Sequence, residues 1–512
     1  MIVYVMGVDI GTTGCKALVF DTEGEVLGSG FKEYGIICPR ANWAEQDPEQ
    51  VWQYAQDVMA QAVAESGRKD IIAISLSVQG DAIIPIDKKG RPLYNALLGM
   101  DYRSWEQAQA CAQVIGGQKL FRITGMRPHP INSLTKIMWL KQNEHDIYNT
   151  TWKFTTYADF LLLKLTGVAA IDYSMASRTM AFDLELRDWS GEVLTAVDIG
   201  KAVFSKAVPS GTVLGPILQQ VAERVGVSQK AVVVAGGHDQ ACAALGAGVI
   251  DENIALDSHG TAEVVSTTLI QPVLTDLMYD SFYPCYYHVI PDRFFTFALN
   301  HVGGILLQWY RDQFEAAEVS EAKATGVDSY EAIIGRIPRG PSPVMVMPHF
   351  NGSGTPWCDT RSRGAIVGLT LATTRHDIVK GIMESLTYEM RMNLEILDQA
   401  GLSIKYLRCV GGAARSPVWL QLKADITGCQ VTTLQTREAA CLGAALIAGT
   451  AVGVYKTLSE AVEIAVVLDK VYSPAMKMNE QYDKRYELYQ KLYPALREFN
   501  HELVNAEGIR RQ

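Results

Sequence analysis

This sequence lacks several features that would immediately assign a protein to a class. No apolar run is long enough to span a bilayer, and the apolar start is short, lacks a basic flank and soon meets Asp9. We therefore expect neither a membrane protein nor a signal peptide. The nine cysteines are scattered and form no CxxC pair, a pattern typical of reduced thiols in the core of a cytoplasmic protein.

Two kinds of binding site are missing as well. No long basic block occurs and the net charge is −10, so we expect neither nucleic acid nor an anionic membrane as the partner. No GxxxxGK[ST] motif occurs, which excludes a Walker-type phosphate loop. What remains is a chain of 512 residues, 48% hydrophobic and 20% charged, the composition of an ordinary globular protein with room for two domains or more.

The opening stretch predicts two strands joined by a glycine-rich turn. The apolar runs VYVMGVDIG and KALVFD flank TTGC, so we expect a β-hairpin here and not a loop that leads from a strand into a helix. Asp9 stands in the first strand, where burying an unpaired carboxylate is costly. Either Asp9 caps an amide of the turn, or a cation neutralises it.

A related arrangement occurs in the middle of the chain. The segment NIALDSHGTAEVVSTT again places an aspartate, Asp257, ahead of Gly-Thr between two apolar strands. The echo suggests two related domains, each with a mixed five-stranded sheet flanked by helices, and a deep cleft between them. The predicted domains are 1–250 and 251–475. A helical tail, 476–512, follows, and tyrosines at helical spacing predict that one of its faces is docked.

The two Gly-Thr turns have the chemistry of phosphate-binding loops. Their backbone amides and threonine hydroxyls can cradle phosphate oxygens, and Lys16 adds a cation. Mg²⁺ that keeps several waters can join Asp9 to a phosphate without repulsion. One turn from each half can then hold the two ends of a polyphosphate across the cleft. A plain hairpin turn, in which Asp9 caps an amide, is the open alternative.

Asp239 lies in GGHDQ, just after an apolar strand. Ligands gather at such strand ends in α/β folds, and a carboxylate there can take a proton from an attacking hydroxyl. Gln240 can orient the same substrate. A helix cap at Asp239 is the alternative, and it is compatible with catalysis. Two nearby histidines, His238 and His259, receive no catalytic role, because a lone histidine near a turn is more often structural.

A second polar group follows or flanks strands in SVQGD and GMDYRS. It contains Gln79, Asp81, Asp101 and Arg103. Amide, carboxylate and guanidinium together suit a polyhydroxylated ligand, because each buried hydroxyl needs a donor and an acceptor. A surface loop in which Arg103 forms a salt bridge with Asp101 is an equal alternative.

Six segments in this order resemble the FGGY family of carbohydrate kinases, within the actin-like ATPase superfamily. They are DIGTTGCKALVFD, NWAEQDPEQVW, SLTKIMWLKQN, GAIVGLTLATTRHDIVKGIMES, GGAARSPVWLQLKADITG and EAACLGAALIAG, and the similarity runs from Gly7 to about Tyr455. Ile131 and Gly381 depart from the residues usual in the two family signatures. The resemblance implies an α/β fold of two actin-like (ribonuclease H-like) domains, each a mixed sheet flanked by helices, with a cleft between them.

The resemblance also implies roles for single residues. Asp9 would hold Mg²⁺, and Asp239 would be the general base. The residues expected to bind ATP are Thr12, Thr13, Lys16, Gly260, Thr261, Gly304, Gln308, Gly412, Ala413 and Ser416. The residues expected to bind the sugar are Gln79, Gly80, Asp81, Asp101, Arg103, Asp239 and Gln240. The partner is then a small sugar or polyol, with no nucleic acid and no membrane, and a homodimer is left open.

The carbohydrate itself is harder to predict. Gln79-Gly80-Asp81 replaces the Gln-Met-His type segment of xylulose and gluconate kinases and resembles the erythritol and L-xylulose kinases. A tyrosine of glycerol kinases is missing near Ile131, and Met100 replaces a usual tryptophan, yet GSGTPWCDTRSRGAIVGLT resembles the glycerol kinase segment. We expect an ATP-dependent kinase of a xylulose-type pentulose or of a short polyol such as erythritol. The alternatives are an actin-like ATPase that couples hydrolysis to conformational change, and a non-catalytic sugar sensor.

Overall fold

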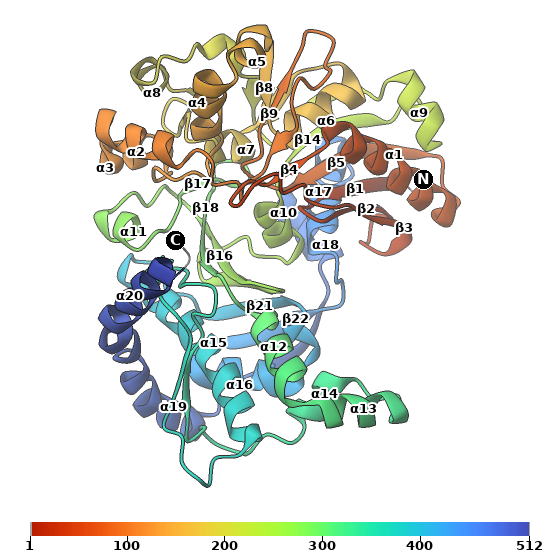
Figure 1. The fold of residues 1–512 in the computed structure, drawn as a ribbon. Coiled ribbons are helices and arrows are strands. Elements are labelled where there is room, and N and C mark those ends of the chain that lie inside the picture. Colours follow the sequence, from red (N-terminus) through yellow and green to blue (C-terminus); the bar gives the residue numbers. More distant parts are fainter. Residues whose placement is uncertain (1–2, 511–512) are drawn as a thin grey trace.

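The computed structural model describes residues 3–510, with side chains to residue 506. Each half of the chain contains one large β-sheet (Figure 1). The first sheet has the order β13-β14-β5-β1-β2-β3. Its strands are β1 (Tyr4–Ile10), β2 (Gly14–Phe20), β3 (Val26–Glu33), β5 (Ile71–Val78), β13 (Val213–Pro216) and β14 (Val232–His238). The second sheet has the order β17-β18-β16-β15-β21-β22-β23. Its strands are β15 (Ile254–His259), β16 (Glu263–Leu269), β17 (Tyr286–Tyr287), β18 (Phe294–Asn300), β21 (Tyr406–Gly411), β22 (Gln430–Leu434) and β23 (Leu468–Tyr472).

Five strands of each sheet correspond in order and direction. In the first sheet, β1, β2 and β3 form an antiparallel meander, and β5 and β14 continue it in parallel on the other side of β1. In the second sheet, β15, β16 and β18 form the meander, and β21 and β22 continue it in parallel beside β15. The two related domains that the Asp-x-Gly-Thr echo suggested therefore share one topology.

The predicted number of five strands per sheet is wrong, because short strands extend the edges. The antiparallel β13 lies outside β14 in the first sheet, and the antiparallel β17 and β23 lie outside β18 and β22 in the second. The sheets consequently have six and seven strands. These edge strands are short or exposed and carry little of the alternation by which a strand is recognised.

The predicted helix start at Asp47 is confirmed. Helix α1 (Pro48–Ser66) begins with a proline, and the Asp47 carboxylate accepts hydrogen bonds from the amides of Glu49 and Gln50. A side-chain oxygen at this position satisfies amides that have no partner within the helix. The helix packs on β2 and β3 and so covers one face of the first sheet.

Helices α10 (Asp239–Gly246) and α17 (Ala439–Ala451) pack against each other between the two sheets (Figure 1). Although α17 falls within the predicted domain 251–475, it packs on β1, β5 and β14 of the first sheet. The contact is close because it is built on glycine. A Cβ at Gly443 would lie 1.9 Å from the Cys242 carbonyl oxygen, and a Cβ at Gly7 would lie 1.9 Å from that of Cys441. The division at residue 250 stays a proposal.

Helices α15 (Arg375–Gln399), α16 (Pro417–Thr427) and α19 (Met476–Tyr489) pack together on the second half. The expected docked face of the tail is confirmed, since its four tyrosines at helical spacing, Tyr482, Tyr486, Tyr489 and Tyr493, are all buried. Three of their hydroxyls donate to glutamates of α15. The fourth, from the final helix α20 (Leu492–Arg510), donates to Asp359 at 2.9 Å.

Smaller elements complete the two halves. The first half adds β4 (Glu45–Gln46), β6 (Ile84–Ile86), β7 (Ala96–Leu97), β8 (Lys153–Thr155), β9 (Ala170–Asp172), β10 (Phe182–Asp183), β11 (Asp188–Trp189), β12 (Lys206–Val208), α2 (Trp105–Val114), α3 (Gly117–Thr124), α4 (Ser133–Asn143), α5 (His145–Thr150), α6 (Tyr157–Thr166), α7 (Tyr173–Arg178), α8 (Gly191–Ala196), α9 (Gln219–Val225) and a 3₁₀ turn (Lys201–Val203). The second half adds α11 (Asp276–Asp280), α12 (Gly304–Phe314), α13 (Ala316–Thr325), α14 (Ser329–Ile334), α18 (Leu458–Ala465), β19 (Met345–Met347), β20 (Ala365–Val367) and a 3₁₀ turn (Ala413–Arg415).

The structure also describes the state of the cysteines and the apolar character of the helices. All nine cysteines are free, and most of them are buried. Among the described residues, no helix is both long enough and apolar enough to cross a membrane.

The contact between α10 and α17 yields a first prediction. Gly443→Ala places a methyl group against the Cys242 carbonyl oxygen, so the helices must separate, and we expect the free energy of unfolding to fall by about 1–3 kcal/mol or more. Gly191→Ala in α8 is the matched control, because a Cβ there meets no atom within 4 Å. Thermal and denaturant unfolding of both variants measure the difference. Equal stability of the two variants would show that the glycine contact is unimportant.

Candidate active site

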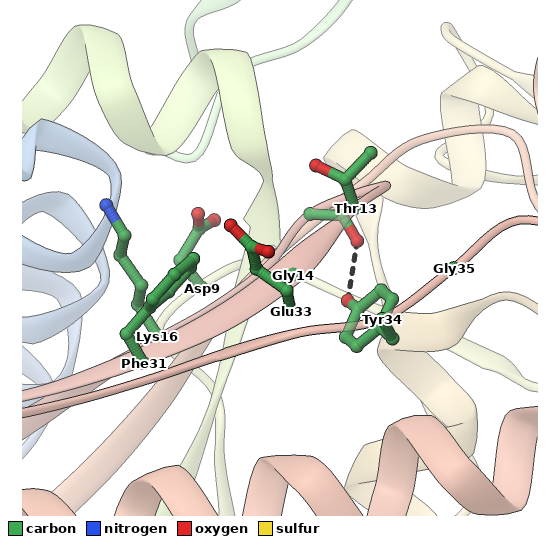
Figure 2. A pocket seen from close by; sticks show the side chains of 9 residues that line it. Asp9, Thr13, Gly14, Lys16, Phe31, Glu33, Tyr34 and Gly35 are labelled. Atoms are coloured by element: carbon green, nitrogen blue, oxygen red, sulfur yellow. Dashed lines mark hydrogen bonds between the residues drawn. The ribbon is translucent and has the colours of Figure 1, made fainter.

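The first hairpin forms as predicted and borders an open pocket. β1 and β2 pair antiparallel, with Asp9 opposite Lys16. The hairpin and the residues at the end of β3 line a cavity of about 770 Å³, formed by Asp9, Gly11, Thr13, Gly14, Lys16, Phe31, Glu33, Tyr34 and Gly35 (Figure 2). Figure 2 shows the Asp9, Lys16 and Glu33 side chains on the same side of the hairpin. Of the predicted phosphate ligands, Thr13 and Lys16 line this cavity, and Thr12 lies in the turn beside it.

Asp9 has little positive charge near it. Its Oδ1 accepts a hydrogen bond from the Ser77 hydroxyl at 2.6 Å, and no ion pair joins it to another described residue. The nearby Lys16 ammonium instead binds both carboxylate oxygens of Glu438, at 2.9 and 2.8 Å. Burial raises the pKa of Asp9 to about 6, although Ser77 and Lys16 partly oppose this. A carboxylate that borders an open cavity and lacks a cation fits a hydrated Mg²⁺.

The corresponding aspartate of the second hairpin has a cation built in. The Lys423 ammonium, from α16, donates to Asp257 and lies 3.0 Å from Glu263 Oε1 and 3.2 Å from His259 Nδ1. Asp257, His259 and Glu263 are close enough together to hold a metal ion, but the ammonium fills that place. Burial lowers the pKa of Lys423, and the two carboxylates more than offset this and raise it above its ordinary value. The second hairpin therefore needs no added cation.

The second Gly-Thr turn gathers several residues that were predicted to bind nucleotide. The amide of Gly304, at the start of α12, donates to the Gly260 carbonyl oxygen at 2.8 Å. The amide of Gly412 donates to the His259 carbonyl oxygen at 2.9 Å. The loop after β21 and the start of α12 thus both attach to the turn that contains Thr261.

The remaining predicted nucleotide residues lie on these same elements. Ala413 is buried in the turn that follows Gly412. Ser416 caps α16, where its hydroxyl accepts a hydrogen bond from the Trp419 amide at 3.3 Å. Gln308 is exposed on α12, one helical turn after Gly304 and on the same face.

Asp239 opens α10 directly after β14. Its Oδ1 accepts a hydrogen bond from the Gln240 amide at 2.6 Å, and about 29% of its side chain is exposed. Burial, together with the charge of Asp9, raises the pKa of Asp239 to about 7, although the Gln240 amide and Arg178 partly oppose this. A carboxylate with a pKa near neutrality is well suited to general-base catalysis. The buried Gln240 Oε1 has no hydrogen-bond partner among the described residues.

The loop after β5 links this site to the first hairpin. The Gln79 side-chain amide donates to the Gly11 carbonyl oxygen at 3.1 Å. Gly80 follows, where a Cβ would lie 2.7 Å from His238 Nε2. Asp81 has a φ of 68°, and its Oδ2 accepts a hydrogen bond from Arg178 at 2.6 Å. Asp81 Oδ1 is buried without a partner among the described side chains, so it can accept a hydrogen bond from a ligand.

Asp101 and Arg103 form the salt bridge that was the alternative interpretation, but they are buried and not part of a surface loop. The Arg103 guanidinium lies 2.7 Å from Asp101 and 2.6 Å from Glu45, and its carbon is 3.6 Å from the centroid of the Trp43 ring. Both Asp101 oxygens already accept hydrogen bonds, including one from the Ala44 amide. Arg103 Nη1 is the atom of this pair that has no partner within the described structure.

Sequence reasoning missed four polar residues around this site. Ser77 binds Asp9 and Glu438 binds Lys16, as described above. Arg178, on α7, binds Asp81. Lys136 is fully buried and donates to the carbonyl oxygens of the loop before α4, and burial lowers its pKa to about 8. The one available signal was a basic side chain among small and apolar neighbours in SMASRTM and SLTKIMWL.

The contrast between the two hairpins yields a second prediction. Asp257→Asn breaks a buried ion pair and leaves Lys423 with Glu263 alone, so we expect the free energy of unfolding to fall by about 3–5 kcal/mol. Asp9→Asn removes a charge that has no cation and keeps an acceptor for the Ser77 hydroxyl. That variant should be at least as stable as the parent at pH 8. Parallel unfolding curves test this, and a large loss of stability in Asp9→Asn would contradict our description of the first hairpin.

Comparisons with known proteins agree with this geometry. The N-terminal domain of the FGGY family of carbohydrate kinases matches residues 4–246, and the C-terminal domain of that family matches residues 255–452. Xylulose kinase from Bacillus subtilis (strain 168) is 28% identical over 499 residues, which cover 97% of this chain and 98% of that protein. Glycerol kinase from Enterococcus faecalis (strain ATCC 700802 / V583) is 30% identical over 516 residues, which cover 97% of this chain and 98% of that protein.

Solved structures show the same fold. The gluconate kinase of Lactobacillus acidophilus superposes with a TM-score of 0.89 at 25% identity, covering 97% of this chain and 98% of that one. The ligand-bound xylulose kinase of the same organism gives a TM-score of 0.88 at 25% identity, covering 96% and 98%. The predicted two-domain α/β architecture is confirmed. The chain belongs to the FGGY family of carbohydrate kinases.

Proposed function

We propose that this phosphotransferase moves the terminal phosphoryl group of ATP to a hydroxyl of a xylulose-type pentulose or of a short polyol, with Asp239 as the general base. The observation that carries the proposal is the position of Asp239. It stands at the carboxyl end of β14, near Asp9 of the phosphate hairpin and near Asp81, whose Oδ1 has no partner among the described residues. Its pKa of about 7 lets it accept a proton at neutral pH.

In this proposal, different residues of the chain have different roles in the reaction. When bound, Mg²⁺-ATP supplies the phosphoryl group together with the cation that neutralises its charge. Asp9 would hold the cation through water, and the turn amides and hydroxyls from Thr12 to Thr13 and from Gly260 to Thr261 would hold phosphate oxygens. Asp239 would accept the proton of the sugar hydroxyl as that oxygen attacks. Closure of the two halves would exclude water, which otherwise competes as the acceptor.

The charges around the sugar site favour a neutral substrate. Arg178 is already paired with Asp81, and Arg103 with Asp101 and Glu45. Neither guanidinium is therefore free to neutralise the carboxylate of an aldonate. Among the described residues, the atoms of this site without partners are two acceptors, Asp81 Oδ1 and Gln240 Oε1, and two donors, Arg103 Nη1 and Arg178 Nε. Such a mixture matches hydroxyl groups, which both donate and accept, and the similarity to xylulose kinases at 28% identity supports a pentulose.

A substrate screen separates the alternatives. The enzyme is incubated with Mg²⁺ and ATP and with a panel of ketoses, polyols and aldonates, and ADP release is measured. We expect turnover with a pentulose or a short polyol and little with aldonates. ADP release that no sugar stimulates would favour an ATPase coupled to conformational change, and no release at all would favour a sugar sensor. The cytoplasmic location and the assembly state stay predictions.

Asp239→Asn tests the general base. Asn keeps the shape and one acceptor but cannot take the proton, so we expect turnover to fall by at least about 100-fold. ATP binding and the melting temperature should stay near the parental values, because the Asp239 side chain does not cap α10, whose N-cap is His238, and Asn keeps an acceptor for the Gln240 amide. The matched control is Asp328→Asn, at the N-cap of α14, where the side chain accepts from two amides. Its turnover should be parental. Near-parental turnover in Asp239→Asn would contradict the proposed role of Asp239 as the general base.

The pH dependence follows from the same residue. Asp239 must be ionised to accept a proton, and burial raises its pKa to about 7. The value of kcat/KM should therefore fall as the pH decreases through about 7, since the protonated fraction grows. The measurement is kcat/KM as a function of pH, in buffers that do not inhibit the enzyme. An acid limb near pH 4, the ordinary range of an aspartate, would contradict the proposed environment of Asp239.

A further inference from the structure

The His238 ring lies between Asp239 and a tyrosine of the second half. Its Nδ1 is 3.0 Å from the Tyr286 hydroxyl, and its Nε2 is 3.3 Å from Asp239 Oδ1. The imidazole and phenol rings are nearly perpendicular, with centroids 5.4 Å apart. Both side chains are buried. His238 is the N-cap residue of α10, and its side chain makes no capping hydrogen bond there.

These contacts define the tautomer of the histidine. Burial lowers the pKa of His238 well below its ordinary value, so the ring is neutral and carries one proton. Burial also keeps the Tyr286 hydroxyl protonated, because it raises its pKa. If the proton were on Nδ1, the lone pair of Nε2 would face the Asp239 carboxylate, which is repulsive. This repulsion favours the tautomer with the proton on Nε2, in which the Tyr286 hydroxyl donates to Nδ1.

Gly80 provides the room for this arrangement. A Cβ at this position would lie 2.7 Å from Nε2 and 2.8 Å from Cδ2 of His238. Any side chain there would push the imidazole away from Asp239. The His238 ring can therefore occupy its position only because residue 80 has no side chain.

Hydrogen bonding leaves the two oxygens of Asp239 unequal. Oδ1 receives the Gln240 amide at 2.6 Å and faces His238 Nε2. We propose that His238, held by Tyr286, is a positioning residue. Its Nε2 lies 3.3 Å from Oδ1 and donates to that oxygen once the substrates bind, so that Oδ2 receives the proton of the substrate hydroxyl. The hydroxyl oxygen then forms its bond to the terminal phosphorus while the bond from that phosphorus to ADP breaks. This inference rests on the proposed role of Asp239 as the base.

The other charged groups near Asp239 do not replace this contact. Asp9 of β1 and Asp81 after β5 raise its pKa, and Arg178 of α7 lowers it, but Arg178 is paired with Asp81. Among the described residues, His238 is the one whose side-chain nitrogen lies within ion-pair distance of Asp239, at 3.3 Å.

The second half of the chain supplies the support for this positioning. Tyr286 lies on β17, an edge strand of the second sheet. The segment around it is attached to the first half, because the Cys285 amide donates to the Gly125 carbonyl oxygen at 2.9 Å. A Cβ at Gly125 would lie only 1.6 Å from the carbonyl oxygen of Cys285, so the two segments are in close contact. The catalytic carboxylate of the first half is thus oriented by a residue from the second.

Four variants of the full chain test the proposal through their pH profiles. His238→Leu removes the proposed donor to Asp239, and Tyr286→Phe removes the hydroxyl that contacts the other nitrogen of that donor. Losing a hydrogen bond to a carboxylate raises its pKa. We expect His238→Leu to move the acid limb of kcat/KM upward by about 0.5 pH unit or more and to lower kcat about tenfold or more. Tyr286→Phe should act in the same direction with a smaller effect.

Two matched variants serve as controls. His238→Gln keeps an N–H donor in reach of Asp239, so its acid limb should stay close to the parental one. Tyr287→Phe removes the neighbouring hydroxyl, which donates to the Leu184 carbonyl oxygen at 2.7 Å and does not touch His238. Its stability should fall, but its acid limb should not move. If His238→Leu does not fold, Tyr286→Phe compared with Tyr287→Phe decides the question.

The possible outcomes are distinct. Unchanged acid limbs in Tyr286→Phe and His238→Leu would overturn the positioning role while leaving Asp239 as the base. Equal shifts in Tyr286→Phe and Tyr287→Phe would overturn it too, because they would indicate a general disturbance. An active Asp239→Asn enzyme would overturn both this inference and the proposed base.

Discussion

A buried carboxylate needs a positive charge, and the two halves of this chain meet that need in different ways. In the second half, Lys423 reaches Asp257 from α16 and neutralises the hairpin permanently. In the first half, Asp9 receives one hydroxyl from Ser77, while the nearest ammonium, that of Lys16, is bound to Glu438. The same hairpin topology is therefore self-sufficient in one domain and short of a cation in the other. We infer that this shortage prepares the first hairpin for the cation that accompanies ATP.

The rest of the site depends on how tightly the two halves are joined behind these hairpins. Glycines let α10 and α17 approach each other and let α17 approach β1. Helix α10 begins with Asp239, so the packing that joins the halves also sets the position of the proposed base. On the other side, Tyr286 reaches from the second sheet to His238. The surroundings of Asp239 thus include residues from both halves, as expected if the two halves close over the substrates.

Much of this could be predicted from local sequence, and the exceptions share a cause. The two hairpins, the cap at Asp47 and the strand-to-helix turn at Asp239 follow from patterns within about ten residues, and all are present. The short edge strands carry no such pattern and were missed. His238 was set aside as a lone histidine because its partner, Tyr286, is 48 positions away in the sequence. One interpretation pairs Asp101 with Arg103 correctly, but their burial depends on Glu45 of β4 and on Trp43 just before it, both far away in the sequence.

The most direct test of the central claim is the Mg²⁺ dependence of ATP binding to the parent and to Asp9→Asn, measured by isothermal titration calorimetry without sugar. If Asp9 is short of a cation that arrives with ATP, Mg²⁺ should tighten ATP binding to the parent by at least about tenfold, which corresponds to about 1.4 kcal/mol. In Asp9→Asn, most of this gain should be lost, while binding of ATP without Mg²⁺ stays the same or becomes tighter because a negative charge is gone. An equal gain from Mg²⁺ in both proteins would contradict the account.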